Sequence, residues 1–440
     1  MSLIEHGLTP RLKPLSARKS TTLSVLDIGT SKIVCLIAQL RPIGGEGALP
    51  GRTHLARVIG IGHQRSQGIK AGAVVDLEAA ETAIRQAIHA AERMAKVEIQ
   101  SVIINMTGGR LGSHRFEADA PIRAGMVALT DIRRVLEIAS SHSLRPGRAV
   151  LHAIPTGFSI DGVRNIVEPS GMVGEKLGVD LHVLSGEGPA ARNLMLAVER
   201  SHLGVEAVIA TPYAAGLSAL ADDEADMGCV MIDLGAGTTS WGVFSGGHIV
   251  HADAIAVGGH HVTMDIARGL TTRVTAAERL KTVFGAASLT AMEEREMVPV
   301  PQVEDDERET DRHIPRGQLA RIIGPRVEEI LELVRDRLRQ AGSAAAGRRI
   351  VLTGGASQLA GLPEVAERIL QGQVRIGRPL GIKGLPEAAK GPAFSAAVGL
   401  LVYPQVAHIE HFEPRSAGIF AAASGDGYLS RMGQWLRESF

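Results

Sequence analysis

The pattern of apolar and polar residues in the first quarter of the chain predicts three short strands followed by one longer helix. Three apolar stretches, TLSVLDIG, KIVCLIAQL and ARVIGIGHQ, are bounded by glycine-rich or polar turns, which is typical of β-strands. The next stretch, DLEAAETAIRQAIHAAERMAKV, repeats its large apolar side chains at helical spacing, at Leu77, Ile84, Ile88 and Met94. This order of elements predicts a mixed α/β fold.

The pattern changes from about residue 99 to residue 175. SVIINM, HRFEADAPI and AVLHAIPTGFSI resemble strands, and TDIRRVLEIASSHS resembles one helix with Thr130 or Asp131 as its N-cap. We therefore expect 99–175 to form a small inserted subdomain.

A second large unit begins near GCVMIDLGAGTTSWGVF and contains two helical stretches, TAAERLKTVFG and LARIIGPRVEEILELVRDRLRQAG. The acidic segment EEREMVPVPQVEDDERETDR between them predicts an exposed loop. After PAFSAAVGLLVY the chain again reads as a loop, through HIEHFEPRSAGIFAAASGDG.

Composition narrows the classes of protein that fit. The chain has 440 residues, enough for two or more domains, and its 47 basic side chains balance 47 acidic ones. A net charge of zero argues against a protein that coats nucleic acid. Cys35 and Cys229 lie in apolar runs, which predicts buried, reduced thiols. Residues 1–20 are basic without an apolar core, so we expect a disordered tail rather than a secretory signal, and a cytoplasmic protein.

A pattern suited to phosphate binding occurs twice, in VLDIGTSKIVCLIA and MIDLGAGTTSWGVF. In each copy an apolar strand ends in aspartate, and a glycine-containing turn leads into a second apolar strand. Such a turn aims backbone N–H groups at phosphate oxygens, and a carboxylate at the strand end suits a water bound to Mg²⁺. The predicted ligands are Asp27, Gly29, Thr30, Ser31, Lys32, Asp233, Gly235, Gly237, Thr238 and Thr239, with Asp27 and Asp233 on the Mg²⁺ side.

One copy of this pattern also fits an ordinary β-hairpin with a tight turn. Two copies in the same setting favour two related halves that close on one nucleoside triphosphate.

A third element, RRIVLTGGASQLAGLPEVAERIL, predicts a strand, a Gly-Gly turn and a helix. Gly354 and Gly355 lack side chains, which leaves room for a base or ribose against the backbone. Glu278 and Lys281 lie one turn apart on TAAERLK. They suit the ribose and base, but they also fit a surface pair, with Thr275 and Glu278 as a capping box. Gly258 and Ser357 complete the predicted nucleotide-binding set.

These segments resemble the actin, Hsp70 and sugar-kinase superfamily, and within it the FtsA family of actin-like division proteins. LDIGTSKI, IDLGAGTT, AERLK, VLTGGASQLAGL, AVGLL and QWLRESF carry the resemblance, from about residue 21 to 440. It implies a two-lobed actin-like ATPase fold with two RNase H-like halves, an ATP and Mg²⁺ site between the lobes, an FtsA-type inserted subdomain and a C-terminal amphipathic helix. It also implies polymerisation through the lobes and binding of the tubulin-like division protein FtsZ.

The resemblance divides the chain into a first lobe (21–98 and 176–225), the insertion (99–175) and a second lobe (226–257 and 345–405). Residues 258–344 become the second-lobe subdomain on the adenosine and FtsZ side, and 406–424 become a linker. The basic residues Arg316, Arg321 and Arg326 on or beside the LARIIGPRVEEIL helix are candidate contacts for the acidic tail of FtsZ, or else solubilising charges.

We predict no catalytic residue. Relatives that hydrolyse ATP well carry an acidic or polar side chain at a helix start between the two phosphate motifs. Thr211 in VIATPYAAGLSAL occupies that place, and a hydroxyl is a poor base at neutral pH. We therefore expect ATP binding with slow or no turnover. The histidines His248, His251, His260 and His261 do not have the spacing of a zinc site.

The last residues, GYLSRMGQWLRESF, predict a helix with one apolar stripe. The stripe consists of Tyr428, Leu429, Met432, Trp435, Leu436 and Phe440. A short helix with such a stripe, a tryptophan and flanking arginines is typical of a membrane surface, although a helix docked on the protein's own core has the same pattern. The glycine-, alanine- and serine-rich tether before it favours the membrane, and the resemblance implies the same role for 425–440.

The resulting hypothesis is an ATP-binding, actin-like division protein that polymerises on the cytoplasmic face of the bacterial inner membrane. There, at the division site, it would anchor FtsZ and help to recruit other division proteins, without binding nucleic acid. Two alternatives stay open. A small-molecule kinase of the same superfamily would need an acidic base beside the hairpins. A pilus-assembly actin homologue is expected to lack the amphipathic tail.

Overall fold

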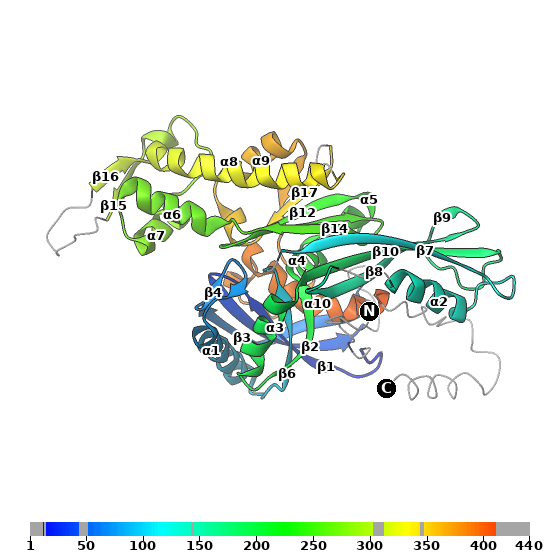
Figure 1. Ribbon diagram of the computed structural model, residues 1–440. Coiled ribbons are helices and arrows are strands. Elements are labelled where there is room, and N and C mark those ends of the chain that lie inside the picture. The colour runs from blue at the N-terminus through cyan, green and yellow to red at the C-terminus, as the bar shows by residue number, and fades with distance from the viewer. Residues whose placement is uncertain are drawn as a thin grey trace.

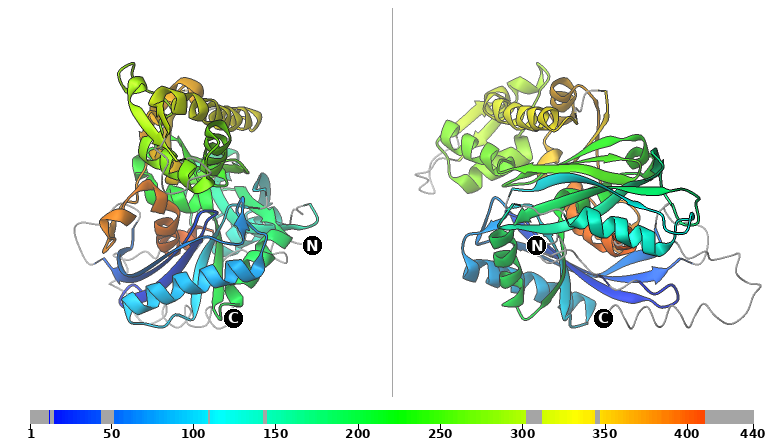
Figure 2. Two further views of the ribbon diagram at one scale, coloured as in Figure 1. Left: turned by 90° about the vertical axis from the view of Figure 1, so that its left-hand side faces the viewer. Right: turned by 45° about the vertical axis from the view of Figure 1, so that its right-hand side comes forward.

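Two lobes and a projecting third unit make up the molecule (Figure 1). The structure is a computed structural model that describes residues 12, 15–43, 52–108, 110–141, 145–301, 312–343 and 347–410. Figure 2 shows from two further sides that the helices of the second lobe form one end of the molecule and the sheet of the first lobe the other.

The first lobe is a six-stranded sheet in the order β11-β6-β1-β2-β3-β19. Its strands are β1 (Thr21–Ile28), β2 (Lys32–Pro42), β3 (His54–Arg65), β6 (Ser101–Met106), β11 (Gly204–Ala210) and β19 (Ile382–Lys383). The first three lie where the apolar segments predict them. The short strands β4 (Ile69–Lys70) and β5 (Ala73–Val74) pair with each other beside it.

Helix α1 (Leu77–Ala95) packs closely on β3 because two glycines of the strand make room for it. A Cβ atom at Gly62 would lie 1.8 Å from the carbonyl oxygen of Ala87. The buried face contains Ile84 and Ile88, as predicted, but alanines complete it. Met94 is 54% exposed, so its assignment to this face is wrong; Ala91 takes the position one turn after Ile88.

The second lobe repeats the first lobe's architecture. Its sheet has the order β14-β13-β12-β17-β18, which matches β3-β2-β1-β6-β11 strand for strand. In both sheets the central strand pairs antiparallel with the next strand in sequence and parallel with the strand on its other side. The strands are β12 (Cys229–Leu234), β13 (Thr239–Ser245), β14 (His248–Ile255), β17 (Arg349–Thr353) and β18 (Gln373–Ile376).

Four helices and a short hairpin cover the second sheet. They are α6 (Gly259–Leu270), α7 (Val274–Phe284), α8 (Arg316–Gln340), α9 (Leu362–Leu370), β15 (Met297–Val300) and β16 (Arg312–Pro315). The hairpin corrects the sequence analysis, which expected an exposed loop there. Val298, Val300 and Ile314 are buried in the second core, so apolar side chains at alternate positions stabilise this hairpin.

The projecting unit is a four-stranded sheet in the order β7-β10-β8-β9, covered by helix α2 (Leu129–Ser140). Its strands are β7 (Gly112–Pro121), β8 (Arg148–Ile160), β9 (Val163–Ile166) and β10 (Lys176–Glu187). The predicted boundaries 99–175 need correction at both ends. Strand β6 pairs with β1 in the first lobe, whereas β10 forms the centre of the inserted sheet, because it hydrogen-bonds to both β7 and β8.

The start of α2 also differs from the prediction. Ala128 is the N-cap, and Asp131 lies inside the first turn. The Asp131 carboxylate accepts a hydrogen bond from the Ala128 backbone N–H at 3.0 Å, so it satisfies a donor at the helix start without being the cap residue.

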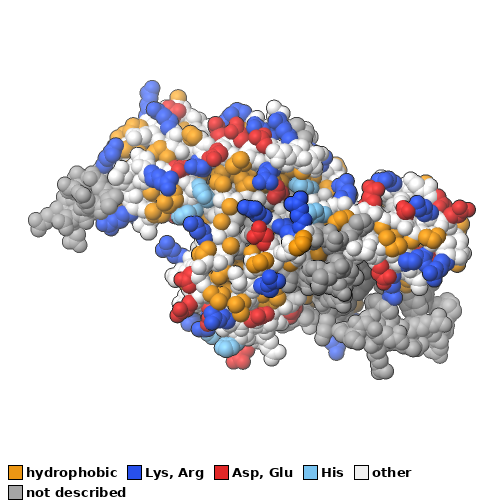
Figure 3. Space-filling view, in the orientation of Figure 1, with side chains coloured by type: hydrophobic (Ala, Val, Ile, Leu, Met, Phe, Trp, Pro, Cys, Tyr) orange, Lys and Arg blue, Asp and Glu red, His pale blue; other side chains and the backbone are white. Residues whose placement is uncertain are grey.

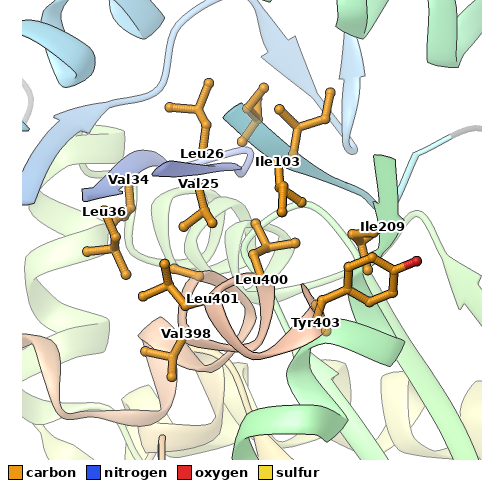
Figure 4. Close-up of a cluster of buried hydrophobic side chains, with 14 of the residues drawn as sticks. Val25, Leu26, Val34, Leu36, Ile103, Ile209, Val398, Leu400, Leu401 and Tyr403 are labelled. Atoms are coloured by element: carbon orange, nitrogen blue, oxygen red, sulfur yellow. The ribbon is translucent and has the colours of Figure 1, made fainter. Parts of the chain in front are cut away.

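Helix α10 (Ser395–Val406) belongs to the first lobe, although it follows the second-lobe strands in sequence. It packs on β1, β2 and β6 and on helix α4 (Thr211–Ala219). Figure 4 shows Leu400 and Leu401 of α10 facing Val25 of β1 and Leu36 of β2. The predicted extent of the second lobe, 345–405, is therefore too long at its C-terminal end.

Among the described residues, the stretch Pro392–Ile409 around α10 is long and apolar enough to span a membrane, but 67% of it is buried inside the protein. It is a core helix, because apolar side chains surround it on every side. The predicted amphipathic helix, 425–440, and most of the linker lie outside the described residues.

Two further predictions concern buried and terminal residues. Cys35 and Cys229 are free and buried, as predicted, and burial raises the pKa of each thiol to about 12. Residues 15–20 and Leu12 are part of the described structure. Leu12 and Leu15 pack against the first core, so the expected disordered tail 1–20 is wrong in its last part.

Candidate nucleotide site

The two predicted phosphate hairpins have the same local structure. Asp27 and Asp233 are each the penultimate residue of the central strand of their sheet. The backbone N–H of Gly29 donates to the carbonyl oxygen of Lys32 at 3.0 Å, and that of Gly235 donates to Thr238 at 2.9 Å. Both turns are thus closed by the same hydrogen bond, three residues apart, at the same place in two equivalent sheets.

The hairpins meet across the junction of the lobes. A Cβ atom at Gly237 would lie 2.5 Å from Oγ1 of Thr30, so only glycine lets the second hairpin approach the first this closely. The Gly-Gly turn packs against the second hairpin at the same junction. Gly354 has φ +85°, and a Cβ atom on it would lie 2.2 Å from Oδ1 of Asp233. Gly258 packs on the carbonyl oxygen of Gly235 in the same way.

Three charged side chains, drawn from both lobes, interact electrostatically where the two hairpins meet. Burial raises the pKa of Asp27, and Lys32 and a hydrogen bond from Asn105 partly offset that rise. Burial, followed by the neighbouring Asp27, raises the pKa of Asp233 to about 7. Burial lowers the pKa of Lys32, against the pull of both carboxylates. Two carboxylates with one lysine favour a further cation, which fits Mg²⁺ held through water and phosphate oxygens.

A polar network from strand β6 holds Asp27, and the sequence analysis missed it. The Asn105 Nδ2 donates to Asp27 Oδ1 at 2.6 Å and to Thr211 Oγ1 at 3.2 Å. Its Oδ1 accepts from the Ile28 backbone N–H at 2.7 Å. Thr107 donates to the Thr211 hydroxyl at 2.5 Å. The sequence signal for Asn105 was a polar residue directly after the apolar run SVII. Asp27 and Asp233 occupy the same position, next to last, in strands β1 and β12.

Lys32 is held by residues that precede α10, which sequence patterns do not connect with it. Its Nζ donates to the carbonyl oxygen of Ala393 at 2.5 Å and lies 3.6 Å from the ring centroid of Phe394. The lysine is therefore positioned by a cation–π contact and a carbonyl oxygen, and the charges of Asp27 and Asp233 act on it electrostatically.

A cavity of about 340 Å³ opens beside the hairpins in the second lobe. Its lining includes Gly259, Lys281, Gly355 and Ala356, so it lies where the resemblance implies the adenosine. Lys281 is bound to Glu278 at 2.7 Å, to Thr263 Oγ1 at 2.9 Å and to the Gly259 carbonyl oxygen at 3.1 Å. Partial burial acts to raise the pKa of Glu278. The hydrogen bonds from Lys281 and Thr263 together have the larger effect, so the pKa is lowered overall.

The capping box proposed for α7 does not form. The N-cap of α7 is Arg273, which puts Thr275 inside the first turn. This removes one of the structural explanations for Glu278 and leaves its ion pair with Lys281 at the edge of the cavity.

Several predicted hydroxyl ligands have their proton engaged elsewhere. Thr239 is buried and donates to the Val257 carbonyl oxygen at 2.8 Å, and Ser357 donates to Gly354 at 2.7 Å. The proton of Thr239, predicted as a donor to phosphate, therefore has another acceptor, and Ser357, predicted as part of the nucleotide-binding set, has its proton engaged within the Gly-Gly turn. Thr30 accepts the Gly72 backbone N–H at 3.2 Å, and Ser31 is exposed.

The three arginines suggested for FtsZ do not form one patch. They are spaced five residues apart on α8, so successive side chains point about 140° apart. Arg316 is 16% exposed, donates to the Phe284 carbonyl oxygen and lines the cavity. Arg326 is paired with Asp265 at 2.6 Å. Arg321 is exposed.

A metal site made of protein side chains only is not found among the described residues, where no three His, Cys, Asp or Glu side chains gather suitably. Asp27 and Asp233 suit a Mg²⁺ ion that the phosphates of a nucleotide also ligate.

Two family models match this chain. The model described as cell division protein FtsA matches residues 230–399, and the model of the SHS2 domain inserted in FtsA matches 108–185. The cell division protein FtsA of Rhizobium meliloti (strain 1021) is 54% identical and covers 98% of both chains. FtsA of Escherichia coli (strain K12) is 35% identical, over 94% of this chain and 97% of that protein.

Solved structures support the same fold. The PilM–PilN type IV pilus biogenesis complex aligns with a TM-score of 0.60 over 88% of this chain and 99% of that chain, at 16% identity. MreB5 of Spiroplasma citri bound to ADP aligns with a TM-score of 0.51 over 89% and 98%, also at 16% identity. The predicted actin-like fold with its inserted subdomain is confirmed. The match at 108–185 also agrees with the corrected boundaries of the insertion.

Proposed function

Since this chain belongs to the FtsA family of cell division proteins, we propose that it binds Mg²⁺–ATP between its lobes and, in that form, polymerises and anchors FtsZ to the cytoplasmic face of the inner membrane. The observation that carries this proposal is the meeting of the two hairpins. Thr30 lies against Gly237, and the buried Asp27 interacts electrostatically with the partly buried Lys32 and Asp233.

In the proposed complex each lobe contributes a distinct part. The backbone N–H groups of both turns and Lys32 bind the phosphates, and Asp27 and Asp233 orient waters around Mg²⁺. The cavity beside Gly355 and Lys281 takes the adenosine. Bound Mg²⁺ supplies charge neutralisation for the phosphates.

Slow or absent hydrolysis is part of the proposal. Thr211, Asn105 and Thr107 occupy the place of a general base, and they carry hydroxyl and amide groups that do not take a proton at neutral pH. The same observation speaks against a small-molecule kinase. A single-turnover rate of about 1 per second or faster would contradict this part.

Membrane attachment is proposed for residues 425–440 on the sequence pattern described above. FtsZ attachment is proposed for the second-lobe subdomain. There Arg321 is exposed, and Arg326 would exchange Asp265 for a carboxylate of the partner's acidic tail. Arg316 is the least accessible of the three.

The test is co-sedimentation with liposomes, with and without ATP and FtsZ. We expect full-length protein to carry FtsZ to the vesicles, and protein lacking 425–440 to stay in solution with FtsZ. Leu436→Asp, in the apolar stripe, should release the protein, whereas Ser430→Asp, with the same added charge on the opposite face, should not. Binding of the truncated protein to vesicles as tightly as the full-length protein would overturn the membrane role.

A further inference from the structure

One end of the first lobe carries exposed cations that have no part in the nucleotide site. This basic end consists of Arg18, Lys19, Arg41, Arg57 and Lys383, all exposed. None of them has an ion-pair partner in the part of the chain that the structure describes. The basic end lies at the edge of the six-stranded sheet opposite to Asp27, because β1 starts there and runs toward the nucleotide hairpins.

Strand register places three of these cations on one face. Arg57 of β3 lies beside Lys383 of β19, and Leu55, two residues earlier, lies opposite Arg41 of β2. Alternate residues of a strand point to the same side, so Arg41, Arg57 and Lys383 share a face with Leu55. Leu55 is 37% exposed, which adds an apolar side chain to the group.

The local charge balance differs sharply from that of the whole chain. The chain has 47 basic and 47 acidic residues, but residues 15–43 and 52–74 contain a single acidic residue, Asp27, which is buried in the nucleotide site. The basic residues in these two ranges are Arg18, Lys19, Lys32, Arg41, Arg52, Arg57, Arg65 and Lys70.

Not all of these belong to the basic end. Arg52 interacts with Asp222, and Lys32 serves the nucleotide site. On the face drawn in Figure 3, acidic and basic side chains are mixed over both lobes and the inserted subdomain.

The segment before β1 is fixed against this end. His54, the first residue of β3, donates from Nε2 to the Ser16 carbonyl oxygen at 3.1 Å. The Lys19 backbone N–H donates to Ser16 Oγ at 3.1 Å, which turns the chain just before the strand. Arg18 and Lys19 are thereby held beside the ends of β2 and β3.

The chain passes the basic end of the lobe at Gln405, a few residues before the described part ends at residue 410. Helix α10 starts near the nucleotide site, where Ala393 contacts Lys32, and runs away from it. Near its end, Gln405 Oε1 accepts the backbone N–H groups of Thr53 and His54, both at 3.0 Å. Glu410 is then buried and bonded to His152 Nδ1 at 3.0 Å. Residues 411–424, the stretch before 425–440, span at most about 50 Å when fully extended.

We infer that the basic end faces an anionic lipid bilayer and forms a second, electrostatic membrane contact beside the C-terminal segment. The inference rests on the proposed function, because 425–440 brings the lobe to the membrane. The cations, which have no ion-pair partner among the described residues, are complementary to acidic lipid headgroups. The exposed leucine among them is complementary to the acyl chains beneath the headgroups. The location beside Gln405, five residues before the described chain ends, favours a bilayer over an acidic peptide, because 425–440 follows closely in the chain. This contact turns the nucleotide site and the second lobe away from the membrane.

The contact strengthens a single-helix anchor that binds reversibly by itself. Each cation that reaches an anionic surface contributes about fivefold in affinity, and the effect is lost beyond a screening length of about 10 Å. The contribution therefore depends on anionic lipid and on low salt.

The test compares the full-length Arg41→Gln/Arg57→Gln protein with a matched control, Arg268→Gln/Arg339→Gln, which removes two exposed cations of the second lobe. On vesicles of 70% phosphatidylcholine and 30% phosphatidylglycerol, we expect the first variant to bind about 25-fold more weakly than the unmodified protein, and the control to bind unchanged. On pure phosphatidylcholine all three should bind alike.

Equal loss in both variants, or no loss in the first, overturns the inference. Loss of FtsZ capture without loss of vesicle binding would assign the surface to a protein partner and also overturn it. The proposed function fails in a distinguishable way: protein lacking 425–440 would then bind both kinds of vesicle as well as the full chain.

A second readout measures orientation directly. Both native cysteines are buried thiols with raised pKa, so a fluorophore can be attached to one introduced cysteine. Headgroup-nitroxide lipids should quench a label on Ser20→Cys and leave one on Gln340→Cys, at the end of α8, unquenched. Equal quenching of the two labels contradicts the inferred orientation.

Discussion

The first and second phosphate hairpins are the same turn in two equivalent sheets, yet they contribute different chemistry. The first carries Lys32, and its Asp27 is held by the amide of Asn105. The second has no cationic side chain. Thr239 is turned inward to Val257, and the pKa of Asp233 is raised to about 7. The two turns share the same backbone hydrogen bond, whereas their side chains differ, so that in the proposed complex charge neutralisation comes from the first lobe.

The largest expected effect comes from separating the hairpins. Gly237→Val places a side chain where Thr30 now lies, so the lobes cannot close on the phosphates. We expect ATP affinity, measured with a fluorescent analogue, to fall about 100-fold, in line with a cost of about 1–3 kcal/mol for overpacking. Gly157→Val is the matched control, because nothing lies within 4 Å of a Cβ atom there. Unchanged ATP affinity in Gly237→Val would mean that the hairpins do not share one ligand.

A smaller effect should distinguish the two hairpins from each other. Lys32→Met removes the cation but keeps the apolar stem, and we expect about 30-fold weaker ATP binding, because charge-assisted bonds to phosphate are lost. Thr238→Val, in the second hairpin, removes one neutral donor and should cost about fivefold. Titrations of both variants check the difference, and equal losses would show that the asymmetry in charge does not matter for binding.

The smallest effect concerns stability without nucleotide. Because the pKa of Asp233 is raised from 3.8 to about 7 in the folded state, folding favours its protonated form, and this contribution to stability is lost as pH rises through 7. Asn cannot ionise. As the pH rises from 5 to 7, the melting temperature of the unmodified protein should therefore fall relative to that of Asp233→Asn. Above pH 7 the difference between the two should stay constant.

Asp119→Asn is the control for this measurement, since Asp119 is an exposed carboxylate paired with Lys176. A pH-independent difference for Asp233→Asn would contradict the buried, coupled pair of carboxylates.

Sequence patterns predicted those parts of the candidate site whose structure is local. The Asp-x-Gly hairpins, the Gly-Gly turn and the Glu278–Lys281 pair follow from short motifs whose backbone geometry is set within a few residues. They did not predict Asn105 or Phe394, because Asn105 reaches Asp27 across 78 positions of the chain and Ala393 reaches Lys32 across 361. The sequence also does not show which hydroxyl groups already donate to a backbone carbonyl oxygen, as those of Thr239 and Ser357 do.

The amino-acid sequence by itself determined the strands, the two turns and the family, because apolar periodicity and glycine positions act over a few neighbouring residues. Only the tertiary structure decided that β6 and α10 belong to the first lobe, that β10 belongs to the insertion, and that unpaired cations gather at one end of a chain with no net charge. Sheet pairing and the burial of α10 bring together residues hundreds of positions apart, and no local pattern encodes which distant strand or charge will become a neighbour.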